Sequence, residues 1–172
     1  SVAVKTDGTI WSWGYNVFGM LGLGNITDYS SPKQIGALTN WSRVACGDYH
    51  TLAIKTDGTL WSWGYGPDGE LGLGNTTNRS SPVQIGSLTT WSVLGTQSYG
   101  SFAIKTDGTL WAWGQNNLGQ LGTNGITGYS SPKQVGALTN WSQLGSGYGH
   151  LQAVKTDGTL WTWGKRSEEH TS

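Results

Sequence analysis

Apolar side chains in this chain come in short runs that are separated by turn-forming residues. Between two of these runs stands Asp57-Gly58, a dipeptide that accepts the positive φ angle of a tight hairpin. A glycine-rich loop separates this pair of runs from the next pair. No stretch shows the spacing of an amphipathic helix. The pattern predicts four short strands within about fifty residues, at 52–55, 59–63, 83–85 and 91–94.

The same pattern recurs with a period of 50 residues. The segment Lys5-Thr6-Asp7-Gly8-Thr9 returns at Lys55, Lys105 and Lys155, each time followed by a tryptophan pair. Units of this length that contain four antiparallel strands are typical of propeller blades. We therefore predict an all-β chain: a partial β-propeller of about three four-stranded blades plus the start of a fourth, in an open arc. The units are 1–50, 51–100, 101–150 and, in part, 151–164.

The paired tryptophans allow two interpretations. Side chains two residues apart on a strand share a face, so each pair presents two large rings together. Exposed rings of this kind can stack on sugars or bases. All eight paired rings, however, occupy one repeated position, which favours a buried core layer between blades. The pairs are Trp11/Trp13, Trp61/Trp63, Trp111/Trp113 and Trp161/Trp163.

Composition narrows the possible functions. The chain has 10 basic and 10 acidic residues, so a nucleic-acid partner is not expected. Its apolar runs are too short to span a bilayer, and no membrane partner is expected. The 11 tryptophans, 7 tyrosines and 2 phenylalanines argue against a disordered chain. One cysteine, Cys46, cannot form an internal disulfide.

The candidates for chemistry all favour structural roles. Each hairpin has one aspartate (Asp57 in the second unit), whereas calcium needs six or more oxygens in one cage. His50 and His150 lack a recurring nucleophile, and Gly100 stands at the same position in the unit between them. The glycine runs lack the Lys-Ser/Thr of a phosphate-binding loop. We therefore predict no catalytic residue, no cofactor and no metal, and a chain that is not an enzyme.

The loop after each tryptophan pair and the turn before each first strand differ between units. Variable loops rich in Tyr, Asn and Gly on a rigid frame are typical of a recognition surface. Drift among unconstrained loops would leave the same pattern. The recognition hypothesis predicts a protein partner. Its candidate residues are Tyr15, Asn16, Phe18, Asp48, Tyr49, Tyr65, Asp68, Tyr99, Asn116, Asn117 and Tyr148.

Over residues 1–164 the pattern A-[IV]-K-T-D-G-T-[IL]-W-x-W-G, followed by a G-x-L-G turn, resembles the regulator-of-chromosome-condensation repeat family. The resemblance implies a seven-bladed propeller. The family's G-x-x-H-[ST] motif is present at Gly47–Thr51 but not around Gly100, and its G-Q-L-G turn is complete only at Gly119–Gly122. Met20 and Glu70 replace the glutamine in the other two turns.

The named member of that family exchanges guanine nucleotide on a small GTPase and docks on chromatin. Neither activity is carried over, because the chain shows no basic segment for such docking. We instead predict a non-enzymatic module that recognises a protein through its variable loops. The alternatives are a nucleotide-exchange factor, as the resemblance suggests, and a lectin-like binder that uses exposed tryptophan.

The two ends of the chain add two expectations. Seven blades at this period need about 350 residues, so we interpret the chain as a fragment of a longer propeller, and residues 165–172 as a non-native tail. Terminal blades of an open arc expose strand edges and aromatic surface. The chain is therefore expected to self-associate through its open blade edges.

Overall fold

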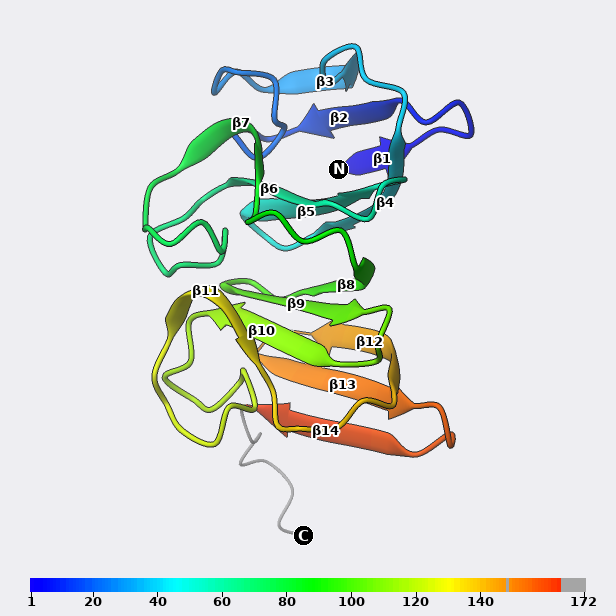
Figure 1. Ribbon diagram of the computed structural model, residues 1–172. Coiled ribbons are helices and arrows are strands. Elements are labelled where there is room, and N and C mark those ends of the chain that lie inside the picture. Colours follow the sequence, from blue (N-terminus) through cyan, green and yellow to red (C-terminus); the bar gives the residue numbers. More distant parts are fainter. Residues whose placement is uncertain (148, 165–172) are drawn as a thin grey trace, which may run out of the picture.

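The computed structural model describes residues 1–147 and 149–164, without the side chain of Ser146; Tyr148 and the tail 165–172 lie outside the described residues. These residues form strands, turns and loops (Figure 1). In the described part of the chain, no helix is long and apolar enough to cross a membrane. The strands are β1 (Val2–Val4), β2 (Ile10–Gly14), β3 (Tyr29–Gln34), β4 (Trp41–Cys46), β5 (His50–Lys55), β6 (Leu60–Gly64), β7 (Arg79–Gln84), β8 (Trp91–Thr96), β9 (Gly100–Lys105), β10 (Leu110–Gly114), β11 (Tyr129–Gln134), β12 (Trp141–Gly147), β13 (His150–Lys155) and β14 (Leu160–Gly164).

The strands form four antiparallel sheets, which we call blades 1 to 4. Blade 1 is β1-β2-β3, blade 2 is β4-β5-β6-β7, blade 3 is β8-β9-β10-β11, and blade 4 is β12-β13-β14. The sheets stack one after another along the molecule (Figure 1). The first strands of blades 2, 3 and 4 contact one another in turn. The predicted all-β, open propeller arc is confirmed.

The blades are offset from the sequence units. The last run of the first unit, β4, pairs with β5 across the short turn 47–49, so that Trp41 lies opposite Lys55. Blade 2 therefore extends over residues 41–84, and the unit border at residue 50 falls inside it. Blades 2 and 3 have four strands, while blades 1 and 4 each have three among the described residues. The chain crosses between blades at 35–40, 85–90 and 135–140 rather than at the unit borders.

The second tryptophan of the pair in blades 2 and 3 fills the junction with the preceding blade. Trp63 is fully buried, and its indole N–H donates to the carbonyl oxygen of Met20 at 3.0 Å. The ring lies against Gly22 of blade 1, where a Cβ would come within 2.7 Å of the indole nitrogen. Trp113 repeats this arrangement against blade 2. For Trp63 and Trp113 the predicted core role is confirmed, and it explains the glycine-rich turn.

The first tryptophan of each pair is only partly buried in blades 1 to 3. The indole N–H of Trp61 donates to Thr59 Oγ1 at 2.9 Å, and the Thr59 hydroxyl donates to Asp57 Oδ1 at 2.7 Å. The Lys55 ammonium lies 3.7 Å from the centroid of the same ring. The repeated K-T-D-G-T-x-W segment is therefore one local network that closes the hairpin. Its aspartate is the turn residue that the sequence predicts.

Candidate functional site

The two ends of the blades differ in construction. The K-T-D-G-T hairpins lie at one end, on the right of Figure 1. The loops after the second tryptophans (15–28, 65–78 and 115–128) gather at the other end, on the left. The turns 47–49 and 97–99, which precede β5 and β9, also reach that end, because β5 and β9 are antiparallel to β6 and β10. The variable segments of the sequence thus meet at one end, which we call the loop end.

Four aromatic side chains from three blades meet there. Phe18 packs edge-on against Tyr65, with ring centroids 4.8 Å apart, and lies 5.7 Å from Tyr49. Tyr99 completes the group, 5.8 Å from Tyr49 and 6.2 Å from Tyr65. All four side chains are partly exposed. We call Phe18, Tyr49, Tyr65 and Tyr99 the aromatic cluster; each is a residue that the sequence analysis selected.

The backbone holds the cluster in place. The N–H of Tyr65 donates to the carbonyl oxygen of Tyr49 at 2.9 Å, which extends the β5–β6 pairing into the loop. Gly64 makes this close approach possible, because it has a φ of 108° and a Cβ there would lie 2.5 Å from the Tyr49 oxygen. The positions of Tyr49 and Tyr65 are therefore set by an extension of the strand ladder.

Carboxylates border the cluster. Asp48 is exposed and accepts a hydrogen bond from the Ser98 hydroxyl at 2.5 Å, which links the turns of blades 2 and 3. Asp68 is partly exposed and accepts from the Gln115 amide at 3.3 Å. Burial, together with the negative charges of Asp68 and Glu70, raises the pKa of Tyr65. The rings and the carboxylates thus form one continuous surface.

Glu70 lies beneath this surface and is completely buried. One carboxyl oxygen accepts the backbone N–H of Asp68 at 2.9 Å, and the other has no hydrogen-bond partner among the residues that the structure describes. Burial raises the pKa of Glu70 to about 8, so the group holds its proton near neutral pH. At the same place in blade 3, the Gln120 amide accepts from the Leu118 N–H and donates to Asn117.

His50 has the structural role that its motif suggested. It is buried, and its Nε2 lies 2.8 Å from the hydroxyl of Ser101, which itself donates to the Glu70 carbonyl. Burial lowers the pKa of His50 to about 4, although the charge of Asp48 opposes this, so the ring is neutral. A neutral ring that donates from Nε2 bonds blade 2 to blade 3.

The missing histidine at Gly100 has a physical reason. The position that corresponds to Ser101 in the next blade is Leu151, which offers no hydroxyl to an imidazole. Gln97 fills the space instead, with its amide oxygen 3.4 Å from where a Cβ of Gly100 would lie. In blade 2 the large and small residues are exchanged: Gly47 corresponds to Gln97, and His50 corresponds to Gly100. Gly47 leaves room for the imidazole, since a Cβ there would lie 2.6 Å from the His50 ring.

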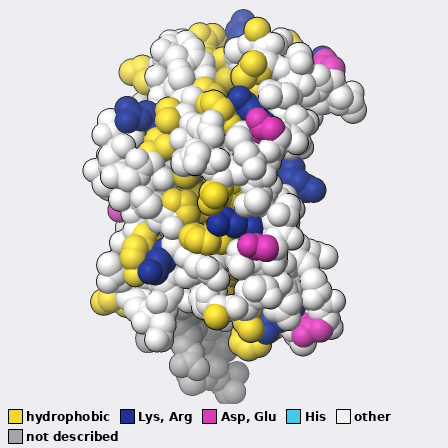
Figure 2. Space-filling view, in the orientation of Figure 1, with side chains coloured by type: hydrophobic (Ala, Val, Ile, Leu, Met, Phe, Trp, Pro, Cys, Tyr) yellow, Lys and Arg dark blue, Asp and Glu magenta, His cyan; other side chains and the backbone are white. Residues whose placement is uncertain are grey.

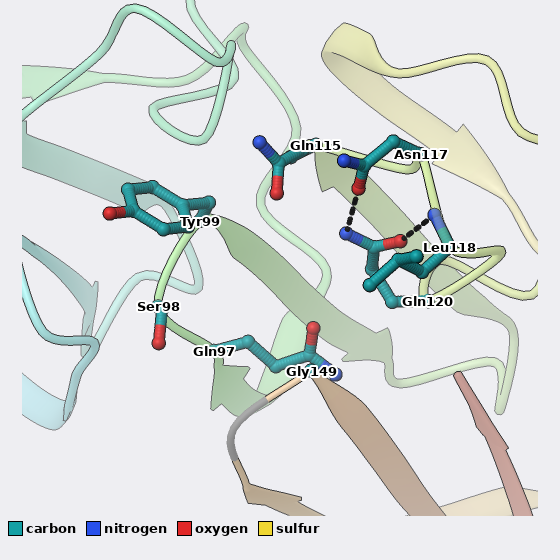
Figure 3. A pocket seen from close by; sticks show the side chains of 8 residues that line it. All are labelled: Gln97, Ser98, Tyr99, Gln115, Asn117, Leu118, Gln120 and Gly149. Carbon is teal, nitrogen blue, oxygen red and sulfur yellow. Dashed lines mark hydrogen bonds between the residues drawn. The ribbon is translucent and has the colours of Figure 1, made fainter. Parts of the chain in front are cut away.

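A pocket lies beside the aromatic cluster, at the junction of blades 3 and 4 (Figure 3). It has a volume of about 220 Å³, and amide side chains dominate its lining. The amide nitrogen of Gln97 is buried, and no described residue forms a hydrogen bond with it. Figure 3 shows Tyr99 on one side and the bonded Asn117, Leu118 and Gln120 on the other. We call this hollow the amide pocket; its lining is Gln97, Ser98, Tyr99, Gln115, Asn117, Leu118, Gln120 and Gly149.

Two of the residues selected as candidates for the recognition surface are not at the surface. Asn16 and Asn116 are buried, and each amide is used inside its own loop. The Asn16 side chain donates to the carbonyls of Asn25 and Thr27 and accepts from the Leu21 N–H; Asn116 makes the equivalent bonds. These asparagines therefore hold the shape of their own loops.

The remaining selected residues are distributed as follows. Tyr15 is 60% exposed, and Asn117 is exposed at the amide pocket. Tyr148 lies outside the described residues. Gln97 and Ser101 were not among the residues selected from the sequence. The second unit has Gln97 and Gly100 where the first has Gly47 and His50, and this exchange could have indicated Gln97.

Apolar grooves also lie between blades, over the hairpin half of the sheets. The groove between blades 1 and 2 has about 400 Å³ and includes Trp41, Trp61 and Leu38; the next, between blades 2 and 3, has about 380 Å³ and repeats these positions. Figure 2 shows hydrophobic side chains exposed along this face of the molecule. Among the described residues, no three His, Cys, Asp or Glu side chains form a group that could hold a metal ion.

Comparisons with known proteins agree with this architecture. The model of the "Regulator of chromosome condensation (RCC1) repeat" matches residues 7–54, 57–95 and 107–154. The ultraviolet-B receptor UVR8 of Arabidopsis thaliana is 39% identical over 54 residues, which is 30% of this chain and 12% of that protein. Protein RCC2 of Mus musculus is 43% identical over 54 residues, 30% of this chain and 10% of that protein.

Solved structures extend the likeness to the whole arc. The crystal structure of human WBSCR16 has a TM-score of 0.84 at 24% identity, covering 95% of this chain and 44% of that one. Yeast RCC1 (Prp20) has a TM-score of 0.77 at 24% identity, covering 94% and 42%. The chain thus spans less than half the length of either solved chain. Since the repeat model covers most of its residues, the chain belongs to the RCC1 repeat family.

Proposed function

We propose that the chain is a non-enzymatic recognition module that binds a protein partner through the loop end. The observation that carries this proposal is the aromatic cluster, in which side chains from three blades form one partly exposed surface. Tyrosine and phenylalanine supply large contact areas at a low cost in conformational entropy. The hairpin end keeps the same residues in all four repeats, whereas the loop end changes.

Protein binding by chains of the same fold supports the proposal. Yeast Prp20 has been crystallised with Kap60 bound, and the binding of Prp20p to Gsp1p and histones has been described. The neutral, buried His50 also supports a binding role over a catalytic one, because a general base needs access to its substrate.

Selection from a phage-displayed library of random 12-residue peptides tests this function. We expect recovered peptides to lose binding to the Phe18→Ser and Tyr65→Ser variants. The matched control is Leu38→Ser with Leu88→Ser, which removes exposed apolar side chains (50% and 47% exposed) from the grooves at the other half. Peptides that bind the loop-end variants as well as the unmodified chain would contradict the proposal.

A lectin-like function is a second candidate, favoured by the partly exposed Trp61 and Trp111 in the two grooves. Stacking on a sugar would change the fluorescence of these indoles. Glycan-array hits that quench this fluorescence, with the effect lost in Trp61→Leu, would favour it. Hits without quenching, or an empty array, would remove it.

A further inference from the structure

Charge is distributed unevenly between the two ends of the blades, although the net charge is zero. The loops and turns at the loop end contain Asp28, Asp48, Asp68 and Glu70, and neither lysine nor arginine. Arg79 begins β7 opposite Gly64, at the loop-end edge of the sheet, whereas the other basic residues among those described lie further along the strands or in the hairpins. Because the buried Glu70 holds its proton near neutral pH, the described part of the loop end has three ionised carboxylates, and its positive groups are Arg79 at the start of β7 and the amino group of Ser1 beside Trp13. Its segments are 15–28, 47–49, 65–78, 97–99 and 115–128.

The hairpin lysines do not compensate these carboxylates. Lys55 lies over the Trp61 ring and interacts with the charge of Asp57, and Lys105 repeats this in blade 3. Strands of five or six residues separate the two ends, a length of about 17–20 Å. At physiological ionic strength the screening length is about 8 Å, so the ends act independently.

Two of the carboxylates lie where a ligand on the cluster would meet them. Asp48 immediately precedes Tyr49 and bonds to Ser98, which immediately precedes Tyr99. Asp68 acts electrostatically on Tyr65 and accepts a hydrogen bond from Gln115. Both are at least partly exposed, whereas Glu70 is buried. The ring surface therefore has one solvent-accessible carboxylate next to Tyr49 and a second one that acts on Tyr65.

Aromatic faces and carboxylates attract the same kind of ligand. The face of a tyrosine or phenylalanine ring is electronegative and attracts a guanidinium or ammonium group, and an adjacent carboxylate pairs with it. Phosphate groups and acidic peptides would be repelled by Asp48 and Asp68. We propose that the aromatic cluster binds a basic segment of a protein, with an arginine or lysine side chain seated against the rings between these two carboxylates. This inference rests on the proposed function and adds the chemistry of the partner.

The test measures the fluorescence anisotropy of a labelled decapeptide, (Arg-Gly)5. Matched probes are (citrulline-Gly)5, which keeps the side-chain shape without the charge, and (Glu-Gly)5. We expect (Arg-Gly)5 to bind at least tenfold more tightly than (citrulline-Gly)5, with affinity that falls as salt rises. Equal binding of the two probes, or tighter binding of (Glu-Gly)5, would overturn the inference.

Variants locate the binding. Asp48→Asn and Asp68→Asn should each weaken (Arg-Gly)5 several-fold, and Tyr65→Leu should weaken it while Tyr65→Phe does not. The control Asp57→Asn removes the same charge at the hairpin end, where an amide oxygen can still accept the Thr59 hydrogen bonds. Its affinity should stay within twofold of the unmodified chain. An equal loss in Asp57→Asn would mean non-specific attraction and would overturn the inference.

The two proposals can fail separately. If selected peptides depend on Phe18 and Tyr65 but carry no excess of arginine or lysine, and (Arg-Gly)5 does not bind, the basic-partner inference is wrong and the recognition function stands. If selected peptides ignore these residues and (Arg-Gly)5 also fails to bind, both are wrong.

Discussion

Two regions of the loop end have the same strand pairing but different side chains. Where blades 1, 2 and 3 meet, the equivalent positions carry aromatic rings, a buried histidine and a buried carboxyl group. Where blades 3 and 4 meet, they carry amides: Gln115 stands for Tyr65, Gln120 for Glu70, and Gln97 and Gly100 for Gly47 and His50. The strand ladders are alike at both places. The frame thus tolerates large changes of side chain, and the surface it presents is set by the loops.

The buried tryptophans show how much each junction contributes to stability. Trp113 is fully buried and its N–H bonds to the Glu70 carbonyl, whereas Trp163 is partly exposed and its N–H has no partner among the described residues. Trp113→Ala should lower the free energy of unfolding by about 3–5 kcal/mol. Trp163→Ala should cost less than half as much. Urea denaturation measures both, and equal losses would contradict the stacking account.

The buried carboxyl group predicts a pH dependence that the amide junction lacks. The pKa of Glu70 rises from 4.5 to about 8 on folding, so the folded state keeps a proton that the unfolded state releases. Its contribution is intact below pH 4.5 and is lost as pH rises towards 8, at up to about 1.4 kcal/mol per pH unit. Glu70→Gln should remove this slope between pH 5 and 8, and Gln120→Glu should add one. A Glu70→Gln variant with the unmodified slope would show that Glu70 is ionised in the fold.

His50 has the opposite sign. Its pKa falls from 6.5 to about 4 on folding, so its contribution is present above pH 6.5 and is lost as pH falls towards 4. Ser101→Ala leaves its buried N–H without a partner and should cost about 1–3 kcal/mol at pH 7. Denaturation curves of two variants distinguish the loss of the hydroxyl from a change in side-chain volume: Ser101→Ala removes the hydroxyl, whereas Ser101→Thr keeps it. Equal destabilisation of both would argue against the hydrogen bond.

The smallest expected effect concerns association on the outer face of blade 4. Leu110 is completely buried against blade 4, whereas the equivalent Leu160 is 61% exposed. We expect the chain to self-associate through this face, and Leu160→Ser to shift its sedimentation towards the monomer. Leu138→Ser, at a 45% exposed site elsewhere, is the control. A chain that is monomeric at high concentration would contradict this prediction.

The repeat predicted the fold class because one motif returned four times in register. It could not predict how strands group into blades, since a run such as 41–46 shows no preference for the strand before it or after it. The cluster residues were selected as variable, but their meeting depends on the stacking of three blades. Asn16 and Asn116 were misjudged because composition does not show that a side chain points into its own loop.

Fluorine NMR of the chain labelled with 3-fluorotyrosine tests most directly whether the aromatic cluster is the recognition surface. A peptide recovered from the selection is titrated in, and resonances are assigned by single Tyr→Phe substitutions. We predict that the signals of Tyr49, Tyr65 and Tyr99 shift together, while those of Tyr29 and Tyr129, on the outer strands β3 and β11, stay in place. Shifts confined to Tyr29 or Tyr129 would contradict the account.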